Sequence, residues 1–544
     1  MARKPLPWPS TRALFTVAAM AMRMAPLASL LRLGELLRGK RVRAWNGLCR
    51  LADSHPDSYS YWRAEIAPLR VRNWIGAAQS IDNGSVVRLE DTDAVMLTDL
   101  LEQQSRRGLA WVVPVLPGDM LDPSLPQLLA SALARHPDAG IIYWDEDVKT
   151  SAGPAFPWIK PGWDLLLHLA RDCLSGASAL HVETALATAA RLPSLPVSAA
   201  GLAELQLAML AKGVNVAHLP LVLTQRGRSA SVDPEWPARV RQHWPDWRLD
   251  ARHDGLPFWR VQPPEPAAWP AVSFIIPTRD RVDLLRTCLS SLARLTYPGN
   301  VEIIIVDNGS SDPSTLALLE AEQAAGRIKV LRDDGGFNFA RLNNRAAAMA
   351  RGELLCLFNN DVEALDGDFL SAMVRHATRP GVGAVGAQLL YPDGSIQHAG
   401  VSIGTGNAAG HTQRGADPAS LHHAGWHAVT RQVSVVTAAC LLVTRAHYRQ
   451  VGGLDEAGFA VAFNDVDFCL KLQVEGLANI YCAEARLIHA ESRTRPSDNR
   501  SDQAARFARE LALLQSRWQT ELCQDPHHSP LFSRSSETCL LSLA

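Results

Sequence analysis

The chain has 544 residues, 47% of them hydrophobic and 20% charged, and its formal net charge is −1. This length allows several domains with sizeable cores and excludes wholesale disorder. The near-neutral charge argues against a nucleic-acid partner. The nine cysteines are scattered singly without a Cys-x-x-Cys pair. This usage argues against a disulfide framework or a zinc ribbon and predicts a reducing, cytoplasmic location.

The N-terminal segment, residues 1–54, is basic and apolar at once. Its first fifty residues contain ten Lys or Arg and a single acid. Two apolar runs, 13–22 and 24–31, are shorter than the ~20 residues that cross a bilayer. We expect an amphipathic segment that either lies on the inner membrane surface or packs on the protein's own body. A secretion signal is the third alternative, disfavoured by Arg23 and Pro26 after the first run.

Residues 55–250 contain a weak set of strand and helix signals. The apolar stretches 109–116 and 140–143 predict two strands, and 201–207 predicts a helix. A Pro/Trp-rich stretch, 251–270, then predicts a linker.

Strands and helices alternate after this linker. Strands are predicted at 272–276, 301–306, 328–331 and 354–358, and helices at 283–295, 315–325 and 338–350. The alternation predicts an α/β domain, 271–495, with a doubly wound sheet and right-handed crossovers. We expect residues 496–544 to form a C-terminal amphipathic helix and tail.

The strand 354–358 is the most informative element, because polar residues follow it at once. Five apolar residues in a row fit a strand covered on both faces, and Asn359, Asn360 and Asp361 come next. Open α/β sheets bind ligands at this carboxyl edge. A hard cation such as Mg²⁺, held by Asp361, would balance the charge of a departing diphosphate. Taken alone, the turn also fits an ordinary cap or loop.

Asp307 ends the strand 301–306 and is followed by Asn308, Gly309 and Ser310. An acid at this place can accept hydrogen bonds from a base or a ribose, and an Asx-turn is the alternative. The chain contains neither a P-loop nor a strand followed by Gly-x-Gly-x-x-Gly, which excludes those two nucleotide-binding motifs.

Two further groups complete the candidate site. Asp465 stands near the beginning of a predicted helix, where it could take a proton from an acceptor hydroxyl or simply cap the helix. His489 follows a strand-like stretch and could contact a metal or a diphosphate, whereas a lone histidine is usually structural.

The order of these segments resembles the family 2 glycosyltransferases of the nucleotide-sugar-binding GT-A type. The likeness covers about residues 270–495 and is closest to rhamnosyltransferase-like members that build O-antigen and cell-wall polysaccharides. The matching segments are FIIPT (274–278), VDNGS (306–310), FNFARLNN (337–344), FNND (358–361), SIQHAG (395–400), TAAC (437–440), GGLD (452–455) and NDVD (464–467).

This resemblance implies a role for each candidate residue. Asp465 would be the general base, and Asp361 with His489 would bind Mg²⁺ or Mn²⁺. The residues implied in nucleotide binding are Pro277, Thr278, Asp307, Asn344 and Asn360. The residues expected near the sugar or the acceptor are Asn464, Asp467, His398 and Trp426, with packing an equal alternative for the last two.

Two positions depart from the family pattern. Asn359 replaces the first acid of the Asp-x-Asp metal motif, so Asp361 carries the charge alone. Asn464 replaces the glutamate that often precedes the base. A carboxylate base opposite a departing diphosphate implies a single in-line displacement, with inversion at the anomeric carbon.

The first half resembles a degraded copy of this domain. Its segments YWDED (143–147) and FPWIKP (156–161) are similar to the first domain of tandem family 2 enzymes. A leucine stands where the second copy has its base, and a leucine cannot remove a proton, so we predict a GT-A-like domain without catalysis. The corresponding pairs are Asp119 with Asp361, Leu202 with Asp465, and Arg226 with His489.

The remaining acids of this copy are expected to be surface groups, as charged side chains usually are. The copy could position a glycan acceptor or brace the second domain. The acids concerned are Asp119, Asp145, Glu146 and Asp147.

The leading hypothesis is therefore an inverting, metal-dependent transferase that moves a sugar from a nucleotide-sugar donor to a glycan or lipid-linked acceptor. A non-catalytic glycan-binding protein is one alternative. A sugar-1-phosphate nucleotidyltransferase is the other, but the loop after the strand 272–276 lacks the glycines that such enzymes need.

Overall fold

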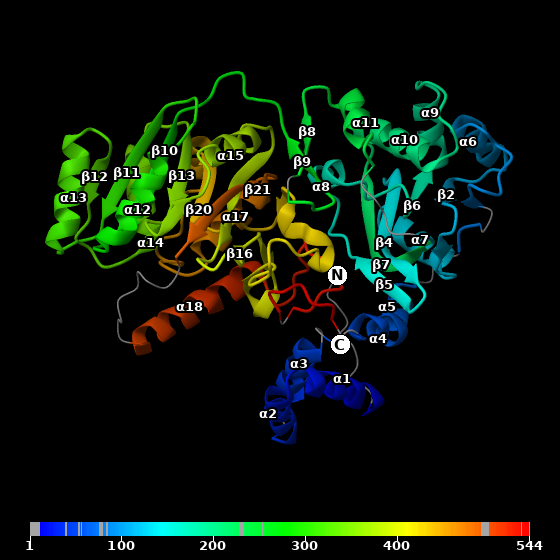
Figure 1. Ribbon diagram of the computed structural model, residues 1–544, viewed down its shortest axis with the longest axis horizontal. Coiled ribbons are helices and arrows are strands. Elements are labelled where there is room, and N and C mark those ends of the chain that lie inside the picture. The colour runs from blue at the N-terminus through cyan, green and yellow to red at the C-terminus, as the bar shows by residue number, and fades with distance from the viewer. Residues whose placement is uncertain are drawn as a thin grey trace. The chain divides into compact units, whose positions relative to one another are not determined.

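The computed structural model describes residues 11–38, 41–52, 55, 57–75, 80–82, 85–227, 233–252, 254–490, 500–534 and 536–542 (Figure 1). The chain divides into two units. The C-terminal unit contains Arg260–His527, and the N-terminal unit contains Arg3–Trp259 together with His528–Ala544. Among the described residues, no helix is both long and apolar enough to cross a membrane.

A ten-stranded mixed sheet forms the centre of the C-terminal unit. Its strands are β10 (Val272–Thr278), β11 (Val301–Asp307), β12 (Lys329–Arg332), β13 (Leu354–Phe358), β14 (Val362–Ala364), β15 (Val382–Leu390), β16 (Ile396–His398), β19 (Arg431–Val433), β20 (Cys440–Thr444) and β21 (Ala478–His489). The main path runs β12-β11-β10-β13-β20-β15-β21-β14. The strands β12, β11, β10 and β13 are parallel, whereas β20 is antiparallel to both of its neighbours.

Helices cover both faces of this sheet. On one face, Ile275 belongs to a core that also contains residues of α14 and α17. On the other, the rings of Phe274 and Phe369 pack on Phe358, with ring centroids 5.5 and 6.3 Å from it. The helices of the unit are α12 (Val282–Leu292), α13 (Pro313–Ala324), α14 (Phe339–Met349), α15 (Phe369–Ala377), α16 (Arg445–Gln450), α17 (Asn464–Val474) and α18 (Arg500–Trp518).

Local sequence explains where several of these helices begin. The Asp312 side chain accepts from the Thr315 N–H at the start of α13, and Asn338 does the same for Arg341 at the start of α14. The unit also contains a small sheet. It pairs β17 (Val401–Ile403) with β18 (Ala409–His411), and two 3₁₀ segments lie beside it, η3 (Thr405–Asn407) and η4 (His422–Ala428).

The predicted α/β domain is confirmed in its parallel half. Every strand and helix predicted between 272 and 358 is present. The strand β10 continues through Pro277 to Thr278 instead of stopping at the proline, because its backbone still pairs with β11 in register there. The antiparallel strand β20 between β13 and β15 was not predicted.

The N-terminal unit contains a seven-stranded sheet. Its strands are β1 (Val86–Arg88), β2 (Trp111–Val115), β3 (Met120–Leu121), β4 (Ile141–Thr150), β5 (Gly153–Trp158), β6 (Ser178–His181) and β7 (Val216–Arg226). Two apolar clusters, one on Leu180 and Leu202 and one on Val113 and Leu219, form its core. A short hairpin, β8 (Arg248–Ala251) with β9 (Trp259–Gln262), follows at the boundary between the units.

Helices surround the N-terminal sheet. The first three of them pack on one another and form a layer of their own. They are α1 (Thr11–Met24), α2 (Pro26–Leu37) and α3 (Arg41–Ala52). The others are α4 (Ser58–Tyr61), the π-helical turn η1 (Trp62–Ile66), α5 (Ala67–Trp74), α6 (Leu97–Arg106), α7 (Leu125–Leu133), α8 (Leu165–Ala170), α9 (Val182–Ala189), α10 (Ala199–Ala211) and α11 (Trp236–His243). A third apolar cluster joins Val17 and Trp45 of the first layer to Phe532 of the C-terminal tail.

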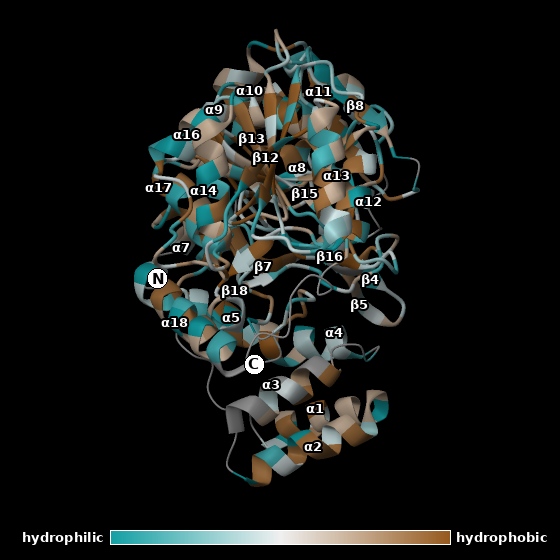
Figure 2. Ribbon diagram, turned by 90° about the vertical axis from the view of Figure 1, so that its left-hand side faces the viewer, coloured by the Kyte–Doolittle hydropathy of each residue, from teal (hydrophilic) through white to brown (hydrophobic). Residues whose placement is uncertain are grey.

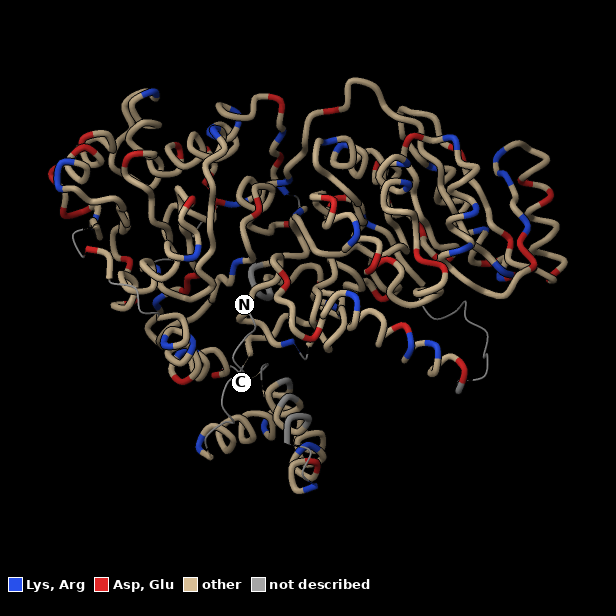
Figure 3. The backbone as a smooth tube through the Cα atoms, turned by 180° about the vertical axis from the view of Figure 1, so that it is seen from behind, with Lys and Arg blue, Asp and Glu red and all other residues tan. Residues whose placement is uncertain are grey.

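The two sheets share one strand order. The N-terminal path β1-β2-β6-β4-β7-β3 matches the C-terminal path β10-β13-β20-β15-β21-β14, strand by strand. The directions of the paired strands also agree, parallel for the first and fourth pairs and antiparallel for the other three. Basic and acidic residues are interspersed along both units (Figure 3).

Candidate active site

The carboxyl ends of β10, β11 and β13 lie next to one another at one edge of the C-terminal sheet. Thr278 pairs with Asp307 at the ends of β10 and β11. The Asn360 side-chain amide donates to the Thr278 hydroxyl over 2.9 Å. Pro277 lies one residue earlier and pairs with Val306. Four of the predicted nucleotide contacts are therefore gathered at the edge where such sheets bind ligands.

Asp307 is buried, and both of its carboxylate oxygens have partners. One accepts from the Ser310 backbone N–H at 2.9 Å, and the other pairs with the Arg332 guanidinium. Arg332 pairs with Asp307 in register at the end of β12, and its side chain is 44% exposed. A nucleoside bound to Asp307 would thus meet Arg332 beside it. Sequence reasoning missed Arg332, although its place at the end of the neighbouring strand was a usable signal.

Asp361 and His489 form a second cluster. The Asp361 carboxylate lies 3.2 Å from His489 Nε2, and the Ala490 N–H donates to the Asp361 carbonyl over 3.0 Å. The antiparallel pairing of β14 with β21, in which Val362 faces His489, holds the two side chains together. Two ligand atoms at right angles on a cation ~2.1 Å away would stand ~3.0 Å apart. The observed separation fits a shared divalent cation.

Gln397 orients the His489 ring, a role that sequence reasoning did not assign. Its amide oxygen lies 2.6 Å from His489 Nδ1, and its amide nitrogen donates to the His489 carbonyl over 3.3 Å. Because an amide oxygen can only accept, the neutral ring carries its proton on Nδ1 and turns its Nε2 lone pair toward Asp361. A metal-ligating histidine is commonly held in this way.

Asp465 lies in the first turn of α17 and faces the loop that precedes β20. Its carboxylate accepts from the Ala438 N–H at 3.2 Å and from the Val466 N–H at 2.9 Å. Burial raises the pKa of this carboxyl above its ordinary value, and the hydrogen bonds oppose that rise only in part. A raised pKa makes the ionised carboxylate a stronger base.

The loop before β20 connects Asp465 to the pair formed by Asp361 and His489. Ala438 donates to Asp465, and the next residue, Ala439, accepts from the Asn359 backbone N–H at 3.0 Å. The Asn359 side-chain amide in turn lies 3.4 Å from His489 Nε2. A short chain of contacts therefore joins the candidate base to the candidate metal ligands.

Two other predicted residues bond to the scaffold. The Asn344 side chain accepts from the Tyr448 hydroxyl at 2.5 Å and from the Leu454 N–H at 3.0 Å. The Asn464 amide donates to the Val461 carbonyl over 2.7 Å at the start of α17. Both side chains hold loops that lead into α17, the helix of Asp465.

Asp467 turns toward the C-terminal helix α18. Its carboxylate accepts from Arg517 Nη1 at 2.8 Å and from the Trp518 indole N–H at 3.0 Å, and Lys471 lies 3.4 Å away. These contacts attach α18 to α17. Sequence reasoning missed Arg517, because the stripe of apolar residues in α18 drew attention to packing alone.

His398 and Trp426 are both buried in the C-terminal unit. His398 is fully buried, with its Nδ1 3.0 Å from His411 Nδ1. Burial, reinforced by His411 and Arg431, holds the pKa of His398 well below its usual range. Trp426 is 5% exposed, and its carbonyl accepts from the Arg431 guanidinium. Each of the two residues thus contacts protein groups on nearly all sides.

The N-terminal unit carries ion pairs at the corresponding edge of its sheet. Arg226, at the end of β7, lies 3.0 Å from the Asp119 carboxylate and 3.5 Å from Glu146. Arg226 thus meets Asp119 much as His489 meets Asp361. The Gly176 backbone passes close by, since a Cβ atom built there would lie 1.3 Å from Arg226 Nη1.

The prediction that the acids of this unit are surface groups is wrong. All four are at most 5% exposed, because each has a buried or half-buried partner. Burial alone would raise the pKa of Glu146, but the cations beside it lower that pKa. The pairs are Asp119 with Arg226, Asp145 with His218, Glu146 with Lys160, and Asp147 with Arg63.

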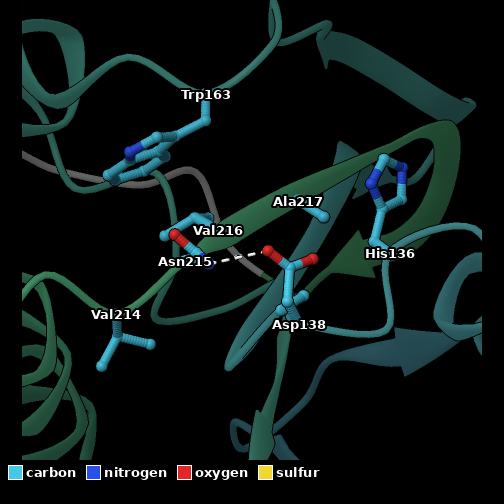
Figure 4. Close-up of a pocket in the computed structure, with 8 residues that line it drawn as sticks. His136, Asp138, Trp163, Val214, Asn215, Val216 and Ala217 are labelled. Carbon is cyan, nitrogen blue, oxygen red and sulfur yellow. Dashed lines mark hydrogen bonds between the residues drawn. The ribbon is translucent and has the colours of Figure 1, made fainter.

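A cavity of about 320 Å³ also belongs to the N-terminal unit (Figure 4). It lies at the amino ends of β4 and β7, where the Asn215 amide donates to Asp138 over 2.8 Å below Trp163. The candidate site residues occupy the carboxyl edge of the other sheet. The cavity is therefore separate from the chemistry described above.

Comparison with known proteins identifies a family for the C-terminal unit. Residues 273–452 match the family model described as glycosyl transferase family 2. A relative named O-antigen biosynthesis protein RfbC, from Myxococcus xanthus, is 35% identical over 398 residues, which cover 70% of this chain and 31% of the relative. The family match, together with the sheet, confirms the predicted GT-A fold of the C-terminal unit.

Two further relatives differ in how much of them is covered. An uncharacterized protein of Sinorhizobium fredii, y4gI, is 36% identical over 78% of this chain and 48% of its own length. The N-acetylglucosaminyl-diphospho-decaprenol L-rhamnosyltransferase of Mycobacterium tuberculosis is 26% identical over 43% of this chain and 80% of its own length. The chain thus spans half or less of y4gI and RfbC.

Proposed function

Because residues 273–452 are a glycosyl transferase family 2 domain, we propose that the protein moves a sugar from a nucleotide-diphosphate sugar to a glycan or lipid-linked acceptor. The transfer inverts the anomeric carbon and serves the synthesis of cell-surface polysaccharide or O-antigen. The names of two relatives, O-antigen biosynthesis protein RfbC and the mycobacterial rhamnosyltransferase, support this assignment. The observation that carries it is the chain of contacts from Asp465 to the Asp361–His489 pair.

The nucleoside part of the donor binds at the ends of β10 and β11, between Thr278 and Asp307, with Arg332 beside it. Pro277 and Asn360 shape the same edge, and Asn344, on α14, supports the loop at 454. Asp361 and His489 would hold Mg²⁺ or Mn²⁺, which would supply positive charge to the departing diphosphate.

Asp465 acts as the general base. Its carboxylate takes the proton of an acceptor hydroxyl, whose oxygen forms the new bond to the anomeric carbon. The bond from that carbon to the diphosphate breaks on the opposite side, and the nucleoside diphosphate leaves with the electron pair. Asn464 and Asp467 hold the first turns of α17, and His398 and Trp426 pack near the acceptor side.

We assign no catalysis to the N-terminal unit. Its proposed GT-A-like region, 55–250, shares the strand order of the catalytic region, 271–495, but has Leu202 in place of a base. A guanidinium, that of Arg226, stands beside Asp119 where the other unit has an imidazole. The unit positions the acceptor or braces the catalytic region through the linker, 251–270.

The protein works in the cytoplasm, at the inner face of the membrane when its acceptor is linked to lipid. The basic segment 1–54 is the part that would touch the membrane, whereas the C-terminal helix and tail, 496–544, complete the two units. No nucleic-acid partner is assigned.

Calorimetric titration with nucleoside diphosphates, with and without Mn²⁺, tests this proposal. We expect binding of at least one nucleoside diphosphate that strengthens with the cation, followed by donor hydrolysis when a panel of nucleotide sugars is screened. Binding of a glycan with no response to any nucleotide would favour the non-catalytic alternative. Release of pyrophosphate from a nucleoside triphosphate and a sugar 1-phosphate would favour the nucleotidyltransferase.

A further inference from the structure

The helix α2 turns leucines toward solvent. The exposed fractions are 79% for Leu27, 55% for Leu30, 72% for Leu31 and 90% for Leu37. The spacing of these four residues places them on one side of the helix, which we call the leucine face, whereas the buried residue of α2 is Ser29. Exposed apolar groups of this size commonly mark a site of contact with a partner or a membrane.

The adjoining helix α1 extends this apolar region. Phe15 is 71% exposed and Met24 is 44% exposed, while Val17 and Met20 of the same helix are buried. Apolar residues run along both helices in Figure 2. The two helices therefore satisfy their own packing and still present a second apolar surface.

The charges around the leucine face are positive. Arg38 follows Leu37 directly, and Arg23 lies in the last turn of α1 beside Met24. Residues 11–38 contain four arginines and one acid, Glu35, which pairs with Arg32 at 2.9 Å. The excess of positive charge is local, because the whole chain carries a formal net charge of −1.

We infer that the leucine face of α2 rests on an anionic lipid bilayer. The leucines would enter the boundary between headgroups and acyl chains, and the guanidinium groups of Arg23 and Arg38 would lie at the level of the lipid phosphates. This inference deepens the proposed function and rests on it, because a lipid-linked acceptor would lie in the same membrane that the leucine face contacts.

Charge decides between a bilayer and a second copy of this chain. Two leucine faces packed together would bring the Arg23 and Arg38 side chains of both copies near one another, and like charges repel. An anionic bilayer covers the same leucines and attracts the same arginines. The bilayer is therefore the better partner for this surface.

Co-sedimentation of the full chain with lipid vesicles tests the inference. We expect binding to vesicles that contain phosphatidylglycerol, weaker binding to pure phosphatidylcholine, and release at high salt. The variant Leu27→Gln/Leu31→Gln should bind at least ~10-fold more weakly, because it removes two inserted side chains. The variant Arg38→Gln should weaken binding to the anionic vesicles by ~5-fold and leave the weak neutral binding unchanged.

A matched control uses exposed leucines of the C-terminal unit. Leu316 and Leu522 are 41% and 64% exposed, and Leu316→Gln/Leu522→Gln should bind vesicles like the unaltered chain. Equal binding of the two double variants would overturn the inference, and so would a dimer that the α2 variant abolishes without any vesicle binding. Titration of the same variants with nucleoside diphosphate in solution separates the two proposals. Absence of nucleotide binding would contradict the transferase proposal, whereas the vesicle assay tests only the membrane inference.

Discussion

Asp465 has a half-buried carboxyl that accepts from two backbone N–H groups, and a chain of contacts leads from it to the Asp361–His489 pair. Replacing it by asparagine keeps the size of the side chain and removes the proton acceptor. We expect Asp465→Asn to bind the donor almost unchanged and to lose turnover by ~10²-fold or more, the usual scale for a general base. Steady-state kinetics and calorimetry on the same preparation separate the two effects, and full turnover would remove Asp465 from this role.

The raised pKa of Asp465 also predicts a pH dependence. The base works only when ionised, so turnover falls as the pH drops through the raised pKa, above the ordinary value of 3.8. Because folding raises this pKa, ionisation of Asp465 destabilises the folded state as the pH rises. The activity that remains in Asp465→Asn should not show this fall at acidic pH. An unchanged fall would show that another group causes it.

Asp361 stands alone where the family pattern often has two acids. We expect Asp361→Ala to weaken cation-dependent binding of a nucleoside diphosphate by ~10- to 100-fold, while binding without the cation changes little. The control is Asp366→Ala, an exposed aspartate five residues along. Unchanged affinity in the presence of Mn²⁺ would place the cation elsewhere.

Gln397 acts on the same site through the ring of His489. Gln397→Ala should weaken cation-dependent diphosphate binding by ~10-fold, because the ring loses the acceptor that fixes its tautomer. Gln397→Glu keeps an acceptor at this place and should restore the affinity. The nitrogen chemical shifts of His489 report the tautomer directly, so unchanged shifts in Gln397→Ala would leave Gln397 with a packing role only.

At the scale of elements, α18 is attached to α17 through Asp467. The Arg517 and Trp518 side chains both donate to this buried carboxylate. Arg517→Ala removes one cation from a buried acid and should lower the free energy of unfolding of the C-terminal unit by ~2–3 kcal/mol. Urea unfolding measures the change, with Arg509→Ala, exposed on the same helix, as the control. Equal stability of the two variants would show that α18 is held by its apolar side chains.

The strands of the parallel half could be predicted because each contains a short run of apolar residues, which is fully buried in β10 and β13 and only partly buried in β11 and β12. The place of the candidate site in the chain could be predicted for a related reason, since Asp307 directly follows such a run and Asp361 follows one after two asparagines. Side-chain contacts between residues far apart in the sequence could not be predicted. Gln397 meets His489 across 92 residues, and Arg517 meets Asp467 across 50, so no local pattern announces either contact.

At the scale of the whole molecule, the two units share one strand order but carry different polar side chains at the corresponding edge of the sheet. We expect Asp119→Ala to leave nucleoside diphosphate affinity unchanged, in contrast to Asp361→Ala. It should instead destabilise the N-terminal unit by ~3 kcal/mol, because Arg226 loses a buried partner. Thermal unfolding and calorimetry together check both halves of this expectation, and a loss of nucleotide affinity would give the N-terminal unit a part in donor binding.

The four acids of the N-terminal unit are buried, which amino-acid composition alone does not predict. Glu146 and Lys160 stand fourteen residues apart, on β4 and just beyond β5, and the hairpin between them brings both into the interior. Asp119 and Arg226 are joined only when β3 pairs with β7. Surface placement was the sound expectation for each acid taken singly, and it failed because every acid is paired.

The close approach of Gly176 to Arg226 limits how this unit can change in descent. A side chain at position 176 would force the guanidinium to move, and that movement would disturb its ion pairs with Asp119 and Glu146. We therefore expect glycine at 176 wherever position 226 carries an arginine that makes these pairs.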